Sequence, residues 1–298
     1  MRIAIFLQQP GDDARPRINR VTGEVIARLM ERGARVDLRV AEDELFDVAA
    51  IRPAHDLYVL KSKSPLTLTV AGVLEDAGAI VVNSVRSCDM ARDKITTTAL
   101  LAASGVGVPP SWATGLPAAL GPFLEGGPLW FKPQRGGNGL GVHRVRVPSE
   151  IPGCVARDAS DLPLPVFAQR ESGGSGRDLK VYIVGDRAWA RSKPWPVRSE
   201  VDKQGIPAHL PGRVQEAAFR CGLALGLEIY GVDFVTDGER FYAVDVNAFP
   251  SSQGPLDLPR HLADYLFARA AGREGRASAQ WLARTWDEDG ALPSLAAR

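Results

Sequence analysis

The sequence has few residues suited to soft-metal or disulfide chemistry. Its 298 residues include three cysteines and four histidines, with no CxxC pair and no two histidines at the spacing of metal ligands. We therefore expect neither a zinc site nor a disulfide framework, and a reducing, cytoplasmic location. No run of about 18 apolar residues occurs, and the apolar run at the amino terminus is too short for a signal sequence. We expect no membrane association.

The sequence also lacks an excess of charge of either sign. Its 36 lysines and arginines balance 35 acidic residues, which gives no case for bulk attraction to nucleic acid or membrane, so any basic site must be local. Two nucleotide-binding fingerprints are missing, because no GxGxxG follows the first apolar strand and no GxxxxGK[ST] occurs. The length and the apolar fraction of 45% predict about two domains, with room for a sizeable core.

The amino-terminal third alternates short apolar strands with helical patterns. Strands are expected at 2–7, 35–40, 56–61 and 79–82, and helices after Asn19 and over 66–77. This alternation predicts a parallel sheet of βαβ units, whose ligands sit beyond the carboxyl ends of the strands. The basic residues of these loops are candidates for binding an anionic substrate, and the alternative is that they are ordinary solvated side chains: Arg15, Arg17, Lys61 and Lys63.

The stretch 230–250 predicts a hairpin that turns at Gly238. If its loop has an odd number of residues, Asp233, Asp245 and Asn247 share one face. The apolar side chains would then share the other face: Val232, Phe234, Tyr242, Val244 and Val246. Two carboxylates and an amide oxygen suit Mg²⁺ or Mn²⁺, which completes its shell with water and phosphate oxygens. The alternative is a solvated acidic face.

Lysines and glycines mark the middle of the chain. A helix is predicted over 89–103 with Lys94 beside its apolar face, and an apolar strand ends at Lys132. The loop that follows contains four glycines whose backbone could approach a phosphate closely: Gly136, Gly137, Gly139 and Gly141. A second hairpin, 178–184 with 187–193, places a group of charged side chains on its strands: Asp178, Lys180, Arg191 and Lys193.

This order of a helix lysine, a strand lysine with a glycine loop, a basic hairpin and an acidic hairpin ending in Asp-Val-Asn resembles the ATP-grasp enzymes. The resemblance covers roughly residues 1 to 270. It implies an α/β plus α+β fold in which two α+β subdomains clamp ATP behind an amino-terminal parallel α/β domain. The implied divisions are an amino-terminal domain with linking helix, a central subdomain, a carboxy-terminal subdomain with the metal site and a tail of unknown role: 1–106, 107–168, 169–272 and 273–298.

The resemblance also implies roles for individual residues. Lys94 and Lys132 would hold the ATP phosphates, with the glycine loop closing over them. The adenine hinge would lie at Gln169, Arg170 and Glu171, although the hinge of similar ligases has Gln-Glu followed by an aromatic residue, which leaves its register open. Asp178 would lie near the ribose, and Asp233, Asp245 and Asn247 would hold Mg²⁺. The candidate catalytic cations are Lys180, Arg191 and Lys193.

Three functions remain open at this stage. RGGNGLGV and GVDFV followed by VDVNAFP resemble the RimK-like carboxylate-amine ligases, which form an amide through an acylphosphate. The segment 179–185, Lys193-Pro194 and 247–250 also resemble the inositol trisphosphate 5/6-kinases, although the glycine loop argues against that branch. The third is a non-catalytic nucleotide-binding module. We expect an anionic small molecule or peptide as substrate and no nucleic acid partner, and a homo-oligomer is left open.

Overall fold

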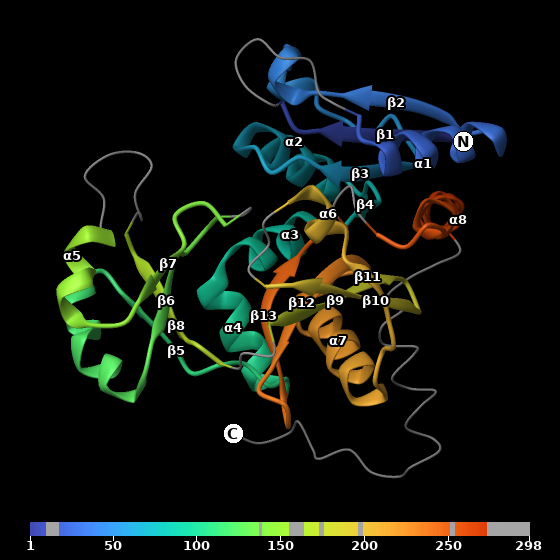
Figure 1. Ribbon diagram of the computed structural model, residues 1–298. Coiled ribbons are helices and arrows are strands. Elements are labelled where there is room, and N and C mark those ends of the chain that lie inside the picture. The colour runs from blue at the N-terminus through green and yellow to red at the C-terminus, as the bar shows by residue number, and fades with distance from the viewer. Residues whose placement is uncertain are drawn as a thin grey trace, which may run out of the picture.

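The computed structural model describes residues 1–9, 18–136, 139–154, 164–172, 176–195, 199–250 and 254–272. Arg15, Arg17, Gly137 and the tail 273–298 lie outside these described residues. The strands form three sheets, with helices packed against them (Figure 1). No helix in the described ranges has the length and apolar character that a membrane span requires.

The amino-terminal sheet is parallel, as predicted, with the strand order β2-β1-β3-β4. Its strands are β1 (Arg2–Leu7), β2 (Arg35–Arg39), β3 (Leu57–Lys61) and β4 (Val81–Val82), connected through α1 (Arg20–Glu31) and α2 (Pro65–Asp76). Asn19 caps α1, since its side chain accepts a hydrogen bond from the Thr22 N–H. Buried strand residues and amphipathic helices thus build the βαβ units expected from the pattern.

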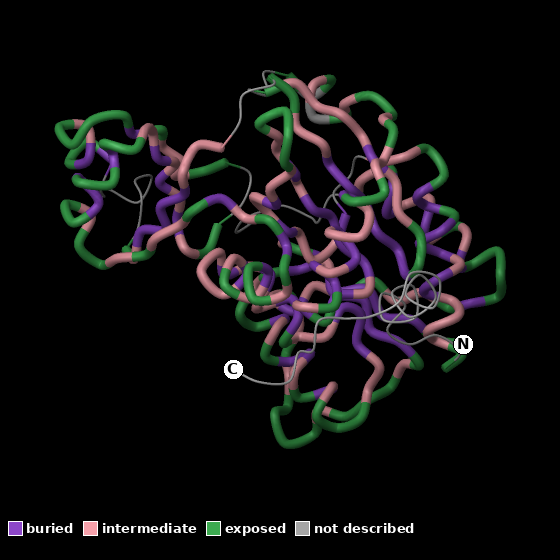
Figure 2. The backbone as a smooth tube through the Cα atoms, turned by 90° about the horizontal axis from the view of Figure 1, so that it is seen from below, coloured by how far each residue is buried: buried purple, intermediate pink, exposed green. Residues whose placement is uncertain are grey.

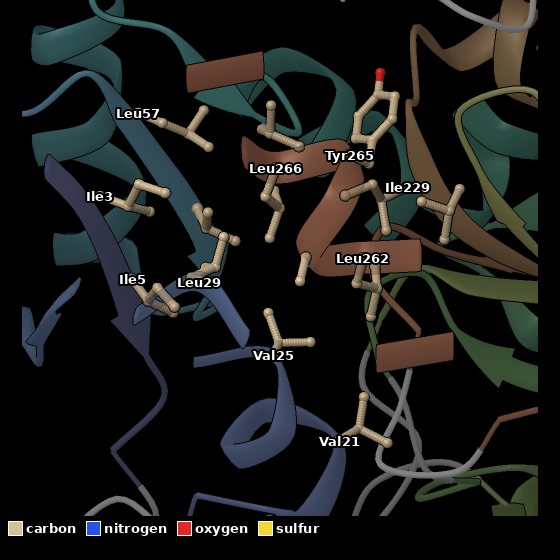
Figure 3. Close-up of a cluster of buried hydrophobic side chains, with 14 of the residues drawn as sticks. Ile3, Ile5, Val21, Val25, Leu29, Leu57, Ile229, Leu262, Tyr265 and Leu266 are labelled. Carbon is tan, nitrogen blue, oxygen red and sulfur yellow. The ribbon is translucent and has the colours of Figure 1, made fainter. Parts of the chain in front are cut away.

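The largest sheet is antiparallel, with the order β11-β10-β9-β12-β13. Its strands are β9 (Arg177–Val184), β10 (Arg187–Pro194), β11 (Ile206–Ala208), β12 (Ile229–Thr236) and β13 (Phe241–Asn247). The helices of this part are α6 (Glu200–Gln204), α7 (Gly212–Leu225) and α8 (Leu258–Ala270). Leu262 and Leu266 of α8 pack in one core with Ile3 and Ile5 of β1, so α8 fastens this part to the amino-terminal sheet (Figure 3).

The third sheet stands to one side of the other two and has a core of its own (Figures 1 and 2). Its order is β5-β8-β6-β7, formed by β5 (Ser111–Thr114), β6 (Leu129–Pro133), β7 (His143–Val145) and β8 (Val166–Arg170). The 3₁₀ segment η3 (Pro117–Gly126) and the short helix α5 (Ile151–Cys154) pack against it. This small core leaves the other face of β6 and β8 open to the rest of the molecule.

The helix predicted over 89–103 is in fact two helices, which corrects the sequence analysis. They are α3 (Val85–Arg92) and α4 (Lys94–Ala103), and the backbone of Asp93 between them is extended, with φ −92° and ψ 106°. The Asp93 side chain accepts hydrogen bonds from the Ile95 and Thr96 N–H groups and so caps α4. Lys94 therefore occupies the first turn of a helix rather than the middle of one.

The hairpin of β12 and β13 also differs from the simple expectation. The connection from Thr236 to Phe241 has four residues, an even number, and a β-bulge between Asp233 and Phe234 corrects the register. Asp233 consequently opposes Asp245 as predicted, while Phe234 opposes Ala243. Val232, Phe234 and Val246 are buried together, but the shifted register pairs Tyr242 with Val235, so the prediction that Tyr242 shares their face was wrong. Val244, at the bulge, is only partly buried.

Candidate active site

Asp233 lies between two lysines of the neighbouring strands. Lys180 Nζ on β9 is 2.8 Å from Asp233 Oδ2, and Lys193 Nζ on β10 is 2.9 Å from Asp233 Oδ1. All three side chains are at most 15% exposed. Burial alone would raise the pKa of Asp233, but the two ammonium groups hold it below its ordinary value. The network holds both ammonium groups against Asp233 at this end of the sheet.

Asp245 and Asn247 lie side by side on β13, with Asn247 Nδ2 donating to Asp245 Oδ2 at 3.1 Å. This leaves carboxylate and amide oxygens available, and Mg²⁺ is commonly held by one or two such groups together with phosphate oxygens. The donor set of Asp245 and Asn247 therefore fits the metal predicted from the sequence. Asp233 does not extend this set in the described structure, because both of its oxygens accept hydrogen bonds from lysines.

Lys132 extends from β6 toward the same carboxylates. Burial lowers the pKa of Lys132 to about 8, and the negative charge of Asp245, the largest opposing influence, only partly offsets this shift. Its Nζ donates to Gln169 Oε1 on β8 at 2.7 Å, a neutral partner. A buried ammonium group whose hydrogen-bonding partner is uncharged is well placed to receive an anion.

Lys94 and Lys63 complete the group of lysines. Lys94 lines a small cleft with Asp245, formed between α3, α4 and β13. Burial lowers the pKa of Lys63, an effect that the charge of Asp245 opposes and the charges of Arg92 and Lys94 reinforce. Lys63, Lys94 and Lys132 therefore approach Asp245 from the amino-terminal sheet, the α3–α4 junction and the third sheet.

The glycine-rich loop is anchored to the start of α4. The Lys94 N–H donates to Gln134 O at 3.0 Å, and Gln134 Nε2 donates to Asp93 Oδ2 at 2.5 Å. Gly139 and Gly141 have φ values of +75° and +66°, in the left-handed region that favours glycine. Tying the base of the loop to α4 places the described glycines next to the lysines.

Asp178 lies opposite Lys193 in the β9–β10 pair. Burial and the negative charge of Asp233 raise the pKa of Asp178 to about 6, although Lys193 partly offsets them. The cluster thus contains five lysines against three aspartates, gathered from several elements: Lys63, Lys94, Lys132, Lys180 and Lys193 with Asp178, Asp233 and Asp245. A local positive excess of this kind favours a polyanion with several negative charges.

Of the three residues predicted to form the adenine hinge, only Gln169 contacts the lysine cluster, through Lys132. The Arg170 guanidinium turns to the opposite face of β8, where it stacks on Trp112 and donates to carbonyls of the η3 region. Glu171 pairs with Arg144 at 2.5 Å. The N–H groups of both residues donate to Pro110 O and Pro128 O, so neither group is free to bind a base.

Two further predicted residues have other surroundings. Lys61 lies over the ring of Phe249, 4.2 Å from its centroid, in an apolar setting that lowers its pKa to about 8 by burial alone. Arg191 donates to the carbonyls of Gln204 and Gly205 and so holds the start of β11. Their predicted roles, substrate binding for Lys61 and catalysis for Arg191, therefore have no support from the described contacts.

The sequence analysis missed the residues that hold the parts of the site together. Asp93 and Gln134 join α4 to the glycine loop, and the buried Asn83 bonds to backbone groups of β12 and to Ala248. Asp93 could have been found as a helix N-cap directly before Lys94. Asn83 has no local signal, because its partners are more than 140 residues away along the chain.

Comparisons with known proteins follow this geometry. No family model matches the sequence. A probable alpha-L-glutamate ligase of Pseudomonas putida is 26% identical over 192 residues, which cover 60% of this chain and 63% of the relative. A D-alanine--D-alanine ligase of Geobacter sulfurreducens is 28% identical over 213 residues, covering 64% of this chain and 66% of the relative. The chain thus spans less than two thirds of the length of these curated relatives.

Solved structures match over most of the chain. The RimK domain ATP-grasp protein of Sphaerobacter thermophilus has a TM-score of 0.69 at 17% identity, covering 89% of this chain and 99% of its own. A RiPP-associated ATP-grasp ligase of Chryseobacterium gregarium, in complex with ADP and a leader and core peptide, has a TM-score of 0.66 at 13% identity, covering 92% and 99%. The ligase PsnB, complexed with a precursor variant, Mg and ADP, has a TM-score of 0.65 at 20% identity, covering 90% and 98%.

The protein therefore has the ATP-grasp fold, as the order of its motifs predicted. The predicted resemblance to the RimK-like ligases is confirmed by the relatives named as probable alpha-L-glutamate ligases. The kinase branch finds no support among the reported matches. Roles for individual residues, and the activity itself, remain to be argued from the site.

Proposed function

We propose that the protein is an ATP-dependent carboxylate-amine ligase that joins a carboxylate to an amine through an acylphosphate. The observation that carries this proposal is the cluster of five lysines and three aspartates, drawn from the three sheets and the α3–α4 junction. The similar proteins are named as an alpha-L-glutamate ligase, a D-alanine--D-alanine ligase and a RiPP-associated ATP-grasp ligase in complex with a leader and core peptide, and these names support this reaction class.

In the proposed reaction a carboxylate oxygen of the substrate attacks the γ-phosphorus of ATP, and ADP leaves. The amine then attacks the acylphosphate carbonyl, loses a proton and expels inorganic phosphate. Lys94 and Lys132 bind the phosphates, while Lys180 and Lys193 are held near the developing charge by Asp233. Loss of one such cation typically lowers the rate about a hundredfold or more.

A magnesium ion held by Asp245 and Asn247 would neutralise charge on the phosphates. The protein's own part is to hold ATP and carboxylate in line and to position Lys180 and Lys193 through Asp233. Cysteine nucleophiles are not used in this scheme. Cys88, Cys154 and Cys221 are buried and burial raises the pKa of each thiol, so little thiolate forms at neutral pH.

The remaining positive charge supports a proposal for the substrate class. Lys63 faces Asp245 and the lysines from the end of β3, where it can meet an anionic group of the acceptor. We propose an amino acid or a peptide carboxylate as acceptor, which agrees with what the similar ligases are named for.

The test is to trap the acylphosphate. The protein is incubated with Mg–ATP, hydroxylamine and a panel of amino acids and acidic peptides, and hydroxamate and ADP are measured. We expect both products together, a loss of about a hundredfold with Lys132→Met, and little change with Arg20→Met, which removes an exposed charge on α1. ADP with a phosphorylated hydroxyl and no hydroxamate would instead indicate a kinase, and no ADP a non-catalytic binder.

A further inference from the structure

The segment that contains α6 and β11 folds back against β10 at the edge of the largest sheet (Figure 1). Gly205 lies between α6 and β11. Ser192 of β10 pairs with Ile206, the first residue of β11. The end of α6 is therefore held beside Lys193, one of the two lysines that donate to Asp233.

The guanidinium of Arg191 fixes the end of α6. Arg191 pairs with Lys180 and lies two residues before Lys193, so its side chain leaves the sheet on the same face as these two lysines. Its Nε donates to Gln204 O at 2.6 Å, and its Nη2 donates to Gly205 O at 2.8 Å. The last carbonyls of a helix have no partner within it, and one planar guanidinium here binds two consecutive carbonyls.

Gly205 lies directly against the side chain of Lys193. Its φ of +60° and ψ of −169° lie in a region of backbone conformation that is essentially restricted to glycine. A Cβ atom at this position would lie 2.8 Å from Lys193 Cγ and 2.5 Å from Ser192 O, both closer than van der Waals contact allows. The bare Cα of Gly205 is therefore the surface over which the aliphatic part of Lys193 passes.

The two ends of the Lys193 side chain are thus held separately. Its Nζ donates to Asp233 Oδ1 at 2.9 Å, and Gly205 confines its Cγ. Lys180, the other lysine on Asp233, also passes a glycine, but a Cβ at Gly231 would lie 3.4 Å from Lys180 Cε, which is an ordinary contact. Of these two glycines, only Gly205 leaves no space for a methyl group.

We propose that Gly205 and Arg191 are positioning residues that hold the ammonium of Lys193 in the reacting site. The proposal rests on the proposed function, in which Lys193 is held near the charge that develops during phosphoryl transfer. Neither residue needs to touch the substrate, because Arg191 acts through the end of α6 and Gly205 acts through Lys193. A misplacement of about 1 Å in a reacting site can cost about a hundredfold in rate, so one methyl group at position 205 is enough to remove the contribution of Lys193.

The test is a double-mutant cycle on the rate of hydroxamate formation. The full chain is assayed with Mg–ATP, hydroxylamine and the panel of amino acids and acidic peptides, as wild type, Gly205→Ala, Lys193→Met and the double variant. We expect each single variant to lower the maximal rate about 30- to 100-fold. In the Lys193→Met background, Gly205→Ala should lower the rate by less than about threefold more, because the group through which it acts is absent.

The dependence on ATP gives a second readout. In Gly205→Ala the Mg–ATP concentration for half-maximal rate should change by less than about twofold, because Lys94 and Lys132 still hold the phosphates. Arg191→Met removes both hydrogen bonds to the end of α6 and should lower the maximal rate about tenfold, again only where Lys193 is present.

Gly33→Ala is the matched control. Gly33 also follows a helix and has a positive φ, +81°, but the described part of the chain leaves open space where its Cβ would stand. The backbone strain of an alanine is therefore similar at the two positions, whereas the close approach to a lysine exists only at Gly205. Gly33→Ala should lower the thermal midpoint and leave the rate of hydroxamate formation unchanged.

The possible outcomes separate this role from the ligase proposal. If Gly205→Ala kept the wild-type rate, or lowered it by the same factor with and without Lys193, the positioning role would be wrong and the ligase proposal would stand. If Gly205→Ala did not fold, the same cycle with Arg191→Met would decide by the same two criteria. If the wild type formed no hydroxamate with any compound of the panel, the proposed function would fail and the positioning role with it.

Discussion

At the scale of the single residue, the most informative group is the ammonium of Lys132. It is buried, its hydrogen bond goes to the neutral Gln169, and burial lowers its pKa to about 8. A charge held in such surroundings destabilises the free protein and is compensated when an anion arrives. A pKa lowered in this way is what we expect of a lysine in the proposed anion-binding site.

This gives a prediction for the pH dependence of ATP affinity. Above pH 8 the free Lys132 loses its proton, and phosphate binding must restore it, so the affinity should fall by up to about tenfold for each further pH unit. Lys132→Arg keeps its charge and should show a flat profile from pH 7.5 to 9.5. Calorimetry over this range checks the prediction, and parallel profiles for the two proteins would contradict it.

Asp178 gives a prediction about stability. Its pKa is raised in the folded protein to about 6, from an ordinary value of 3.8, so its favourable contribution is complete below pH 3.8 and is lost as the pH rises through 6. Asp178→Asn should therefore raise the thermal midpoint relative to wild type increasingly between pH 4.5 and 7.5.

The control for Asp178 has the opposite sign. Hydrogen bonds from the Arg240 and Glu239 N–H groups lower the pKa of Asp237 in the hairpin turn, so its contribution is present at neutral pH and lost as the pH falls. Asp237→Asn should lower the midpoint at pH 7. The account of Asp178 would be wrong if both variants shifted the midpoint in the same direction at neutral pH.

At the scale of the element, the break between α3 and α4 and the bulge in β13 decide where the side chains of the site point. Asp93 ends one helix, caps the next and accepts a hydrogen bond from Gln134 at the base of the glycine loop. The bulge at Asp233 and Phe234 brings Asp233 opposite Asp245 across an even-numbered turn. An uninterrupted helix would place Lys94 in its interior, and a regular hairpin with an even turn would not place Asp233 opposite Asp245.

The effect of removing Asp93 can be compared with the effect of removing Asn19, the cap of α1. Asn19→Ala removes the side-chain cap of α1 and should lower the free energy of unfolding by about 1 kcal/mol without changing ATP affinity. Asp93→Ala removes the cap of α4 together with the bond to Gln134. Asp93→Ala should lower the free energy of unfolding at least as much as Asn19→Ala, and it should also weaken ATP binding several-fold. Denaturant unfolding and calorimetry on both variants would contradict the account if ATP affinity were unchanged in Asp93→Ala.

Much of the fold could be predicted from the sequence because local patterns of residues determine it. The strand and helix pattern of the first 82 residues and the cap at Asn19 follow from apolar periodicity and turn residues, whereas the pairing of Asp233 with Asp245 depends on the bulge. The break at Asp93 and the bulge in the β12–β13 hairpin could not be predicted in this way, because tertiary contacts rather than apolar periodicity determine them. Arg170 was assigned to the adenine hinge from the resemblance alone. Its side chain instead donates to carbonyls of the η3 region, on the face of β8 away from the lysine cluster.

At the scale of the whole molecule, one buried side chain links the amino-terminal sheet to the hairpin that carries Asp245. The amide of Asn83 accepts hydrogen bonds from the Glu228 and Ile229 N–H groups and donates to the carbonyls of Ile229 and Ala248. Ala248 directly follows Asn247. The end of β13 is therefore positioned by a residue that follows β4. The packing of α8 against the amino-terminal sheet joins the same two parts of the molecule (Figure 3).

Asn83→Ala should accordingly affect both stability and metal dependence. Leaving several buried backbone groups without a partner costs on the order of 3 kcal/mol, and we expect the Mg²⁺ concentration for half-maximal ATP binding to rise. Ser87→Ala removes another hydrogen bond across this junction, to Gly226 O, and should lower stability without changing the Mg²⁺ requirement. Equal Mg²⁺ requirements in the two variants would show that Asn83 does not position the end of β13.

The binding of nucleotide tests the central claim most directly. Titration calorimetry with Mg²⁺ and a non-hydrolysable ATP analogue should show one site per chain, and Lys132→Met should weaken binding by about a hundredfold, since it removes the buried cation that faces Asp245. The account would be contradicted if the wild type bound no nucleotide, or if Lys132→Met bound it as tightly as the wild type.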